Sequence, residues 1–171
     1  MTVSRSFGID PGLGRLGFGV VERNGGVLKV LDFGCIETPP RVDIPKRLLL
    51  LYERLEERIV FHAPDFLCVE RLFFGKNITT AEYVFQARGI VLLLAAQKRI
   101  PVYEPKPSQI KSVVCGYGNA EKAQVQKMVQ RLLSLDVLPK PDDAADALAA
   151  ALTGLLLQKT SSLLPREGGV S

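Results

Sequence analysis

The sequence predicts an α/β fold with a mixed five-stranded sheet and helices on its faces. The first third of the chain alternates apolar segments with turn signals, which predicts an antiparallel meander of three strands. The remainder alternates helical patterns with two short, nearly all-apolar segments, which predicts two further strands that run parallel in the sheet centre. The expected strands are residues 4–10, 16–24, 27–38, 66–70 and 101–105.

Helical periodicity marks the segments between and after these strands. In residues 45–62, Leu48, Leu51 and Leu55 recur at helical spacing, with glutamates on the opposite side. Asn119 stands in the position of an N-cap before a later helix. The expected helices are residues 45–62, 78–97, 107–115, 120–135 and 142–157.

Length and composition predict one globular domain. The chain has 171 residues, of which 47% are hydrophobic and 23% charged, enough for one sizeable core. No internal repeat or linker divides it, so we expect a single domain over residues 1–158. Residues 159–171 hold Ser, Pro and Gly and are expected to form a loose tail.

Charge and cysteine content narrow the functional classes. The net charge of +4 favours an anionic partner such as nucleic acid, although a basic protein without one is also compatible. The three cysteines are scattered and form no CxxC, which is typical of reduced thiols in the cytoplasm. We expect no signal peptide and no membrane span, because the apolar run 89–96 is too short. The single histidine, His62, argues against a histidine-built zinc site.

Acids stand at the ends of two expected strands. Asp10 ends the first strand and precedes Pro11-Gly12, so taken alone it is best explained as a turn residue. Glu70 ends the strand 66–70, where open α/β sheets bind ligands. A strand that simply reaches water explains Glu70 equally well.

The last helix carries acids that are harder to explain. It is apolar nearly all round, which predicts burial, and Asp143 and Asp146 share one of its faces. A role at the helix N-terminus explains Asp142 but not Asp146, which lies a full turn further in among alanines. No lysine or arginine lies beside these acids on the last helix or the first strand.

A shared cation would explain the acids if they converge. Two carboxylates about 4 Å apart repel by about 4 kcal/mol at an effective dielectric near 20. Asp10, Glu70, Asp143 and Asp146 would then need a hard divalent cation, Mg²⁺ or Mn²⁺. Two such ions about 3.5–4 Å apart can activate water and stabilise the leaving oxygen in phosphodiester cleavage.

Four successive segments resemble the motifs of the RuvC family of Holliday-junction resolvases. They are GIDPGLGRLGFGVV, VERLFFGKN with QARG, AEKAQVQKMV and DDAADALAAAL, in order over about residues 6–157. The resemblance implies a ribonuclease H-like fold and a homodimer. It also implies Mg²⁺-dependent cutting of four-way DNA junctions, with about two ions per subunit. Paired symmetric nicks would leave 5′-phosphate and 3′-hydroxyl ends, in partnership with the RuvA–RuvB branch-migration complex.

The resemblance also assigns site residues. The family's catalytic, metal-binding acids fall on Asp10, Glu70, Asp143 and Asp146. An aromatic side chain after Glu70 would stack on unpaired bases, worth about 1–3 kcal/mol per base, unless it folds back on the core. Lysines that face DNA in the family are expected to precede or open helices here, where backbone N–H groups favour phosphate. The implied DNA contacts are Phe73, Phe74, Lys76, Arg88, Lys111 and Lys122.

The helix 78–97 has more apolar surface than one stripe against a sheet needs. A second apolar face indicates either burial against a partner subunit or a helix sandwiched inside one subunit.

Three other functions can be weighed against junction resolution. Another ribonuclease H-like nuclease could act on RNA or other branched DNA. An ATPase of the actin and sugar-kinase type would need a second large domain, which 171 residues do not provide. A DNA-binding module without catalysis would have no use for acids that repel phosphate.

Overall fold

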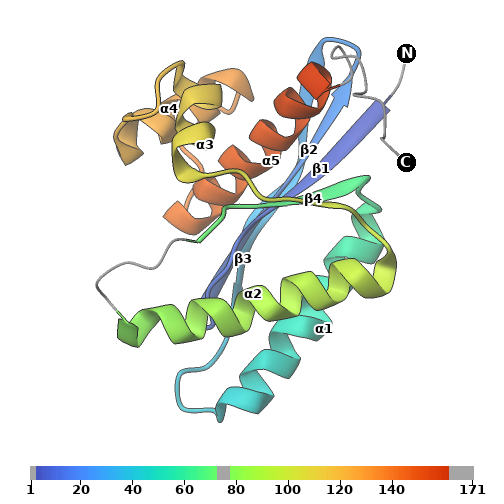
Figure 1. Ribbon diagram of the computed structural model, residues 1–171, viewed down its shortest axis with the longest axis vertical. Coiled ribbons are helices and arrows are strands. Elements are labelled where there is room, and N and C mark those ends of the chain that lie inside the picture. The colour runs from blue at the N-terminus through green and yellow to red at the C-terminus, as the bar shows by residue number, and fades with distance from the viewer. Residues whose placement is uncertain (1–2, 73–77, 162–171) are drawn as a thin grey trace, which may run out of the picture.

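A five-stranded mixed sheet forms the centre of the molecule (Figure 1). The computed structural model describes residues 3–72 and 78–161, except for the side chains of 78–80 and 159–161. Its strands are β1 (Val3–Asp10), β2 (Arg15–Asn24), β3 (Val27–Glu37), β4 (Phe66–Val69) and β5 (Val102–Tyr103). They lie in the order β3-β2-β1-β4-β5. The first three strands are antiparallel, and β4 and β5 continue the sheet in parallel from β1, which confirms the predicted mixed sheet.

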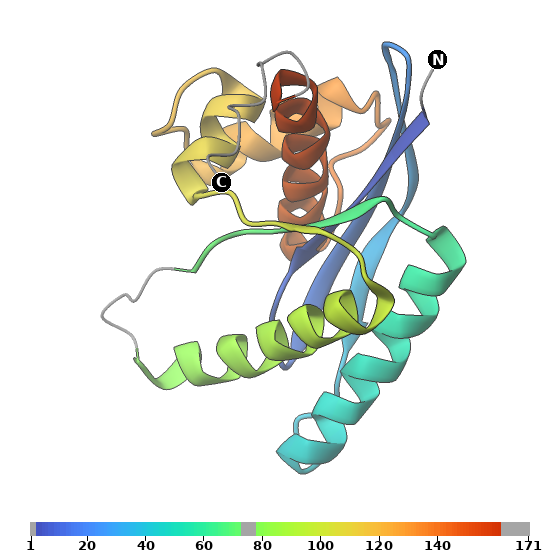
Figure 2. The same cartoon turned by 45° about the vertical axis from the view of Figure 1, so that its right-hand side comes forward.

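Helices cover both faces of this sheet (Figures 1 and 2). They are α1 (Ile44–His62), α2 (Ile78–Lys98), α3 (Pro107–Cys115), α4 (Lys122–Leu132) and α5 (Asp142–Ser161). One core lies between the sheet and the pair α1 and α2, and a second lies where α5 packs with α3 and α4.

Several boundaries differ from those expected. The predicted cap at Asn119 is wrong, because α4 begins at Lys122 and is capped by Glu121, whose N–H donates to the Gln124 side chain over 2.8 Å. This capping box satisfies the free backbone groups of the first turn two residues later than predicted. Lys111 lies within α3 rather than before a helix. Helix α5 continues through Ser161, beyond the expected end of the last helix at residue 157.

Alternation along β1 decides which residues face α5. Phe7 and Ile9 are fully buried in the core beneath α1 and α2. Their neighbours Gly8 and Asp10 therefore point to the opposite face, toward α5. The strand thus delivers one carboxylate to the face that also receives the acids of α5.

Glycines in the sheet allow α5 to lie directly against it. A Cβ on Gly17 would stand 2.1 Å from the carbonyl oxygen of Asp143, and one on Gly8 would stand 1.9 Å from that of Ala147. Neither position can hold a side chain without moving the helix backbone. This close approach fixes the height of Asp143 above the sheet.

We therefore expect Gly17→Ala to displace the first turn of α5. Overpacking should lower the free energy of unfolding by about 1–3 kcal/mol. It should also reduce the DNA cleavage that the acid motifs predict, because Asp143 moves with the helix. Urea denaturation measures the first effect, and a cleavage assay on four-way DNA junctions measures the second. Gly26→Ala is the matched control, because its added Cβ meets nothing within 4 Å. Equal stability of both variants would contradict the close packing.

No helix among the described residues is long and apolar enough to cross a membrane. Cys35, Cys68 and Cys115 are all free thiols.

Candidate active site

The four predicted acids come from three elements that meet at one edge of the sheet. Strands β1 and β4 are parallel neighbours, so Asp10 at the end of β1 and Glu70 just after β4 lie at the same edge. Helix α5 begins above this edge and brings Asp143 and Asp146 in its first two turns. Asp10 interacts electrostatically with all three of the other acids.

The pKa values record how these acids affect one another. Burial, followed by the charges of Asp146, Asp143 and Glu70, raises the pKa of Asp10 from 3.8 to about 7. Burial is also the largest cause of the raised pKa values of Glu70 and Asp146. The site therefore holds more negative charge than its surroundings neutralise, which is typical of a functional centre.

Two cations from other elements lie beside the acids. The Nζ of Lys122, at the start of α4, is 2.9 Å from Asp146 and 3.7 Å from Asp142. Arg15 of β2 lies between Asp143, at 3.4 Å, and Glu37, at 3.0 Å. Sequence spacing indicates neighbours only within one helix or strand. Lys122 and Arg15 lie on other elements than the acids they contact, so the sequence does not indicate them.

The described residues contain no group of three or more His, Cys, Asp or Glu side chains already arranged to hold a metal ion. The ion pairs explain this, because Asp146 turns to Lys122 and Asp143 turns to Arg15 rather than to a common centre. The chemistry of the donor set still fits a divalent cation. All four side chains offer carboxylate oxygens, and the raised pKa values of three of them show a demand for positive charge.

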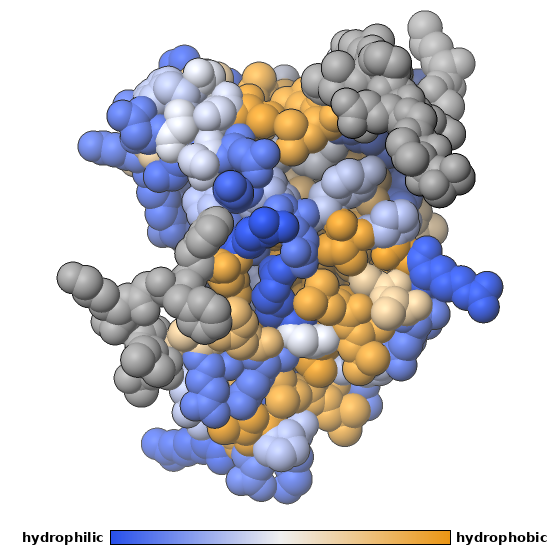
Figure 3. Space-filling model, in the orientation of Figure 1, coloured by the Kyte–Doolittle hydropathy of each residue, from blue (hydrophilic) through white to orange (hydrophobic). Residues whose placement is uncertain are grey.

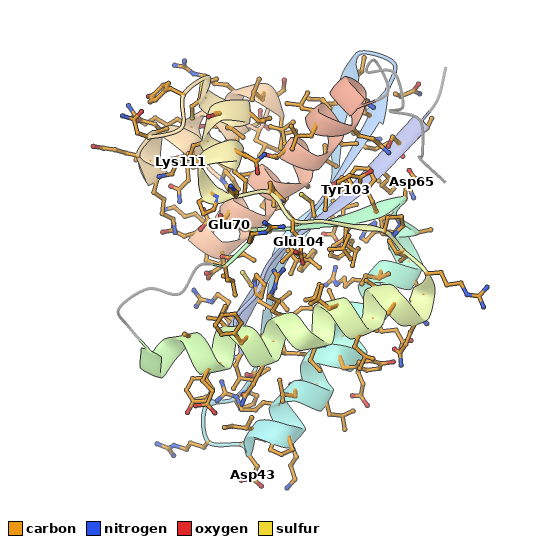
Figure 4. The ribbon with its side chains drawn as sticks, in the orientation of Figure 1. Asp43, Asp65, Glu70, Tyr103, Glu104 and Lys111 are labelled. Atoms are coloured by element: carbon orange, nitrogen blue, oxygen red, sulfur yellow. The ribbon has the colours of Figure 1, made fainter. Side chains whose placement is uncertain are left out.

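An open cleft of about 270 Å³ adjoins the acids. Its lining includes Glu70 and Asp146 together with Lys111 and Lys122. Figure 4 shows Lys111 on α3 near Glu70, and its charge lowers the pKa that burial raises at Glu70. The cleft therefore places two ammonium groups where a phosphate approaching the acids would pass.

The other predicted DNA contacts do not line the cleft or lie outside the described residues. Arg88 lies inside the protein, with a side chain 11% exposed, bound to the Glu70 carbonyl and to Glu104. Its predicted DNA contact stays untested, and the structure gives it internal partners instead. Phe73, Phe74 and Lys76 lie outside the described residues.

Sequence reasoning missed two residues of this region. Arg15 stands in the first motif segment, and the hairpin register that pairs it with Glu37 was the available signal. Glu104 directly follows β5, beside the end of β4. This position at a strand end was the only sequence signal for a functional role.

The fold and the acid cluster together define a ribonuclease H-like nuclease. The family model for the crossover junction endodeoxyribonuclease RuvC matches residues 6–154. The chain therefore belongs to the RuvC family.

Relatives in this family match most of the chain. A crossover junction endodeoxyribonuclease RuvC of Chloroflexus aggregans is 54% identical over 148 residues, which are 86% of this chain and 90% of the relative. One from a Roseiflexus species is 51% identical over 152 residues, covering 89% and 90%.

Solved structures agree with the family. Thermus thermophilus RuvC, solved in complex with a Holliday junction substrate, matches with a TM-score of 0.88 and 34% identity over 93% of this chain and 97% of that one. The yeast mitochondrial Holliday junction resolvase matches with a TM-score of 0.67 at 18% identity, covering 94% and 81%. The second match shows a shared fold alone.

Proposed function

We propose that this chain resolves four-way DNA junctions by paired, symmetric nicks that leave 5′-phosphate and 3′-hydroxyl ends. The observation that carries the proposal is the meeting of Asp10, Glu70, Asp143 and Asp146 beside a cleft lined by lysines. Membership of the RuvC family and similarity to a protein solved with a Holliday junction support this choice of substrate.

The four acids would hold Mg²⁺, with two ions per subunit and Mn²⁺ able to substitute. When bound, Mg²⁺ supplies a Lewis acid that activates water and neutralises the charge of the scissile phosphate. Asp10 and Glu70 would bind the cations from the side of the sheet, and Asp143 and Asp146 would bind them from α5. All four side chains are half-buried, which strengthens their electrostatic effect on a bound cation.

Lys111 and Lys122 would bind the phosphates next to the cut. Both ammonium groups line the cleft, and Lys122 already contacts the Asp146 carboxylate. Their positive charge offsets the repulsion between the acids and an approaching DNA strand. The site thus combines acids that bind cations with lysines that hold DNA.

A homodimer would provide the second nick. Helix α2 exposes Tyr83, Leu92 and Leu93 by 38–49%, so it is not sandwiched inside one subunit. Figure 3 shows hydrophobic residues gathered over this part of the surface. Such an apolar face suits a two-fold interface, and sedimentation of the purified protein tests it. Partnership with RuvA–RuvB and a cytoplasmic location complete the proposal.

Cleavage of a synthetic four-way junction, with a linear duplex of the same sequence and an RNA–DNA hybrid as controls, tests the function. Symmetric nicks in the junction alone, dependent on Mg²⁺, are expected. Equal cutting of the duplex would point to a general nuclease. Cutting of the RNA strand would support the alternative ribonuclease H-like activity.

Phe73→Ala should reduce junction cleavage more than junction binding. A phenylalanine that stacks on an unpaired base contributes about 1–3 kcal/mol, which would be lost in the distorted, cleavage-ready junction. Single-turnover cleavage and gel-shift titration measure the two quantities, with Phe74→Ala as the neighbouring comparison. Unchanged turnover in Phe73→Ala would favour a phenylalanine that packs on the core.

A further inference from the structure

The peptide that joins Glu70 to Arg71 is held at both ends. The N–H of Arg71 donates to the carbonyl of Pro105 over 2.8 Å, beyond the end of β5. In a trans peptide the carbonyl of Glu70 points the opposite way, toward β1. The pairing of β1 with β4 ends at Ile9 and Val69, so the ladder supplies no further partner there.

Arg88 of α2, on the sheet face that α1 and α2 cover, supplies that partner. Its Nη1 donates to the Glu70 carbonyl over 3.1 Å, and its Nη2 pairs with the Glu104 carboxylate. A planar guanidinium presents these two donors in a fixed fork, so both contacts depend on one orientation. Because the side chain is only 11% exposed, water cannot readily replace either contact.

We propose that Arg88 and Glu104 form a positioning pair that aims the Glu70 carboxylate into the active site. This rests on the proposed function of Glu70. Arg88 touches the backbone of Glu70 rather than any reacting atom, so it acts through that acid. The pair joins α2, the end of β4 and the segment after β5. Figure 4 shows Glu70 and Glu104 on the neighbouring segments that follow β4 and β5.

The chain leads from this pair to a helix that lines the cleft. Glu104 lies shortly before α3, the helix that carries Lys111. The ion pair therefore lies between the segment that carries Glu70 and the segment that leads to Lys111, and both of these residues line the cleft. It also connects both to α2, the helix with the exposed apolar face.

Four variants test the role of the pair. Arg88→Met removes both donors, Arg88→Lys keeps the charge without the fork, and Glu104→Gln keeps the volume without the charge. Lys98→Met is the matched control, because it breaks another ion pair of α2, with Glu56 at 2.6 Å, away from the acids. Each variant is compared by melting temperature, Mn²⁺ binding in calorimetry, junction affinity without metal, and single-turnover cleavage at saturating junction.

Arg88→Met should cleave about 10–100-fold more slowly and bind Mn²⁺ several-fold more weakly, as outer partners of metal-binding groups do when lost. Its junction affinity should stay within about twofold of the parent, since the side chain does not face the cleft. Arg88→Lys should recover the melting temperature but not the cleavage rate. Glu104→Gln should lose part of the rate, and Lys98→Met none of it.

Three results would overturn the proposal. Weakened junction affinity with a normal saturated rate would make Arg88 a DNA contact. Rates that follow the melting temperature in all variants would make the pair merely structural. Normal rates and Mn²⁺ binding in Arg88→Lys and Glu104→Gln would exclude positioning even if Arg88→Met fails to fold. If the parent protein does not cut junctions, the proposed function fails, while the Mn²⁺ titrations still decide the role of Arg88.

Discussion

Asp146→Asn should abolish junction cleavage and leave junction binding intact or stronger. The substitution keeps the shape of the side chain but removes one of the four charges that would hold the cations. Losing several kcal/mol of charge stabilisation in the transition state corresponds to a rate at least about a thousandfold lower. Single-turnover cleavage with saturating Mg²⁺ measures it.

The binding half of this expectation comes from Lys122. In the parent chain the Nζ of Lys122 forms an ion pair with Asp146 over 2.9 Å. Without the carboxylate, the ammonium is available to DNA phosphate and the repulsion on the approaching strand falls. We expect junction affinity in EDTA to rise about two- to tenfold, an effect that should shrink at high salt.

Asp142→Asn tests whether the effects of Asp146→Asn come from the loss of any negative charge or from the loss of a proposed metal ligand. Asp142 lies one turn before Asp146 on α5, is 3.7 Å from the same lysine and is 67% exposed, but it is not one of the four acids. Its removal should raise junction affinity slightly and leave cleavage near normal. Full activity in Asp146→Asn, or equal losses in both variants, would contradict the assignment.

Local patterns in the sequence contain most of the fold. Alternation in β1 and the Asn24-Gly25-Gly26 turn predict the meander, and the structure confirms both strands on either side of that turn. Alternation also places Asp10 on the face opposite Phe7, which is where α5 lies. Such features depend on neighbours in the chain, so one sequence suffices to find them.

Contacts between distant elements are what the sequence could not supply. Lys122 is 24 residues from Asp146 along the chain, and nothing local indicates that α4 would turn its first residue toward α5. Arg88, a predicted DNA contact that stays untested, binds the Glu70 carbonyl and Glu104, partners that the sequence does not indicate. A long, flexible cationic side chain can reach several partners, so its choice is decided by the folded surroundings.

Asp10→Asn should stabilise the protein at pH 8 but not at pH 5, in buffer without divalent cations. Burial and then the neighbouring acids raise the pKa of Asp10 from 3.8 to about 7, so folding disfavours its ionised form. The stability of the parent chain should therefore fall as the pH rises from about 4 to 7, and the loss should be complete above that range.

The size of this effect follows from the shift. Each pKa unit corresponds to about 1.4 kcal/mol, and about two units lie between pH 5 and the raised value. Because the site opens to a cleft, we expect a gain of about 1–2 kcal/mol in Asp10→Asn at pH 8 relative to pH 5. Urea denaturation at both pH values measures it.

Asp43→Asn, at an acid 78% exposed, is the control and should change stability equally at both pH values. Saturating Mg²⁺ should reverse the order at pH 8, because a cation that binds the ionised carboxylates stabilises the parent but not Asp10→Asn. If Asp10→Asn changed stability equally at pH 5 and pH 8, Asp10 would be neither buried nor crowded by the other acids in the folded protein. The two pH values thus test the burial and crowding of Asp10, and the Mg²⁺ arm tests the proposed purpose of the acids.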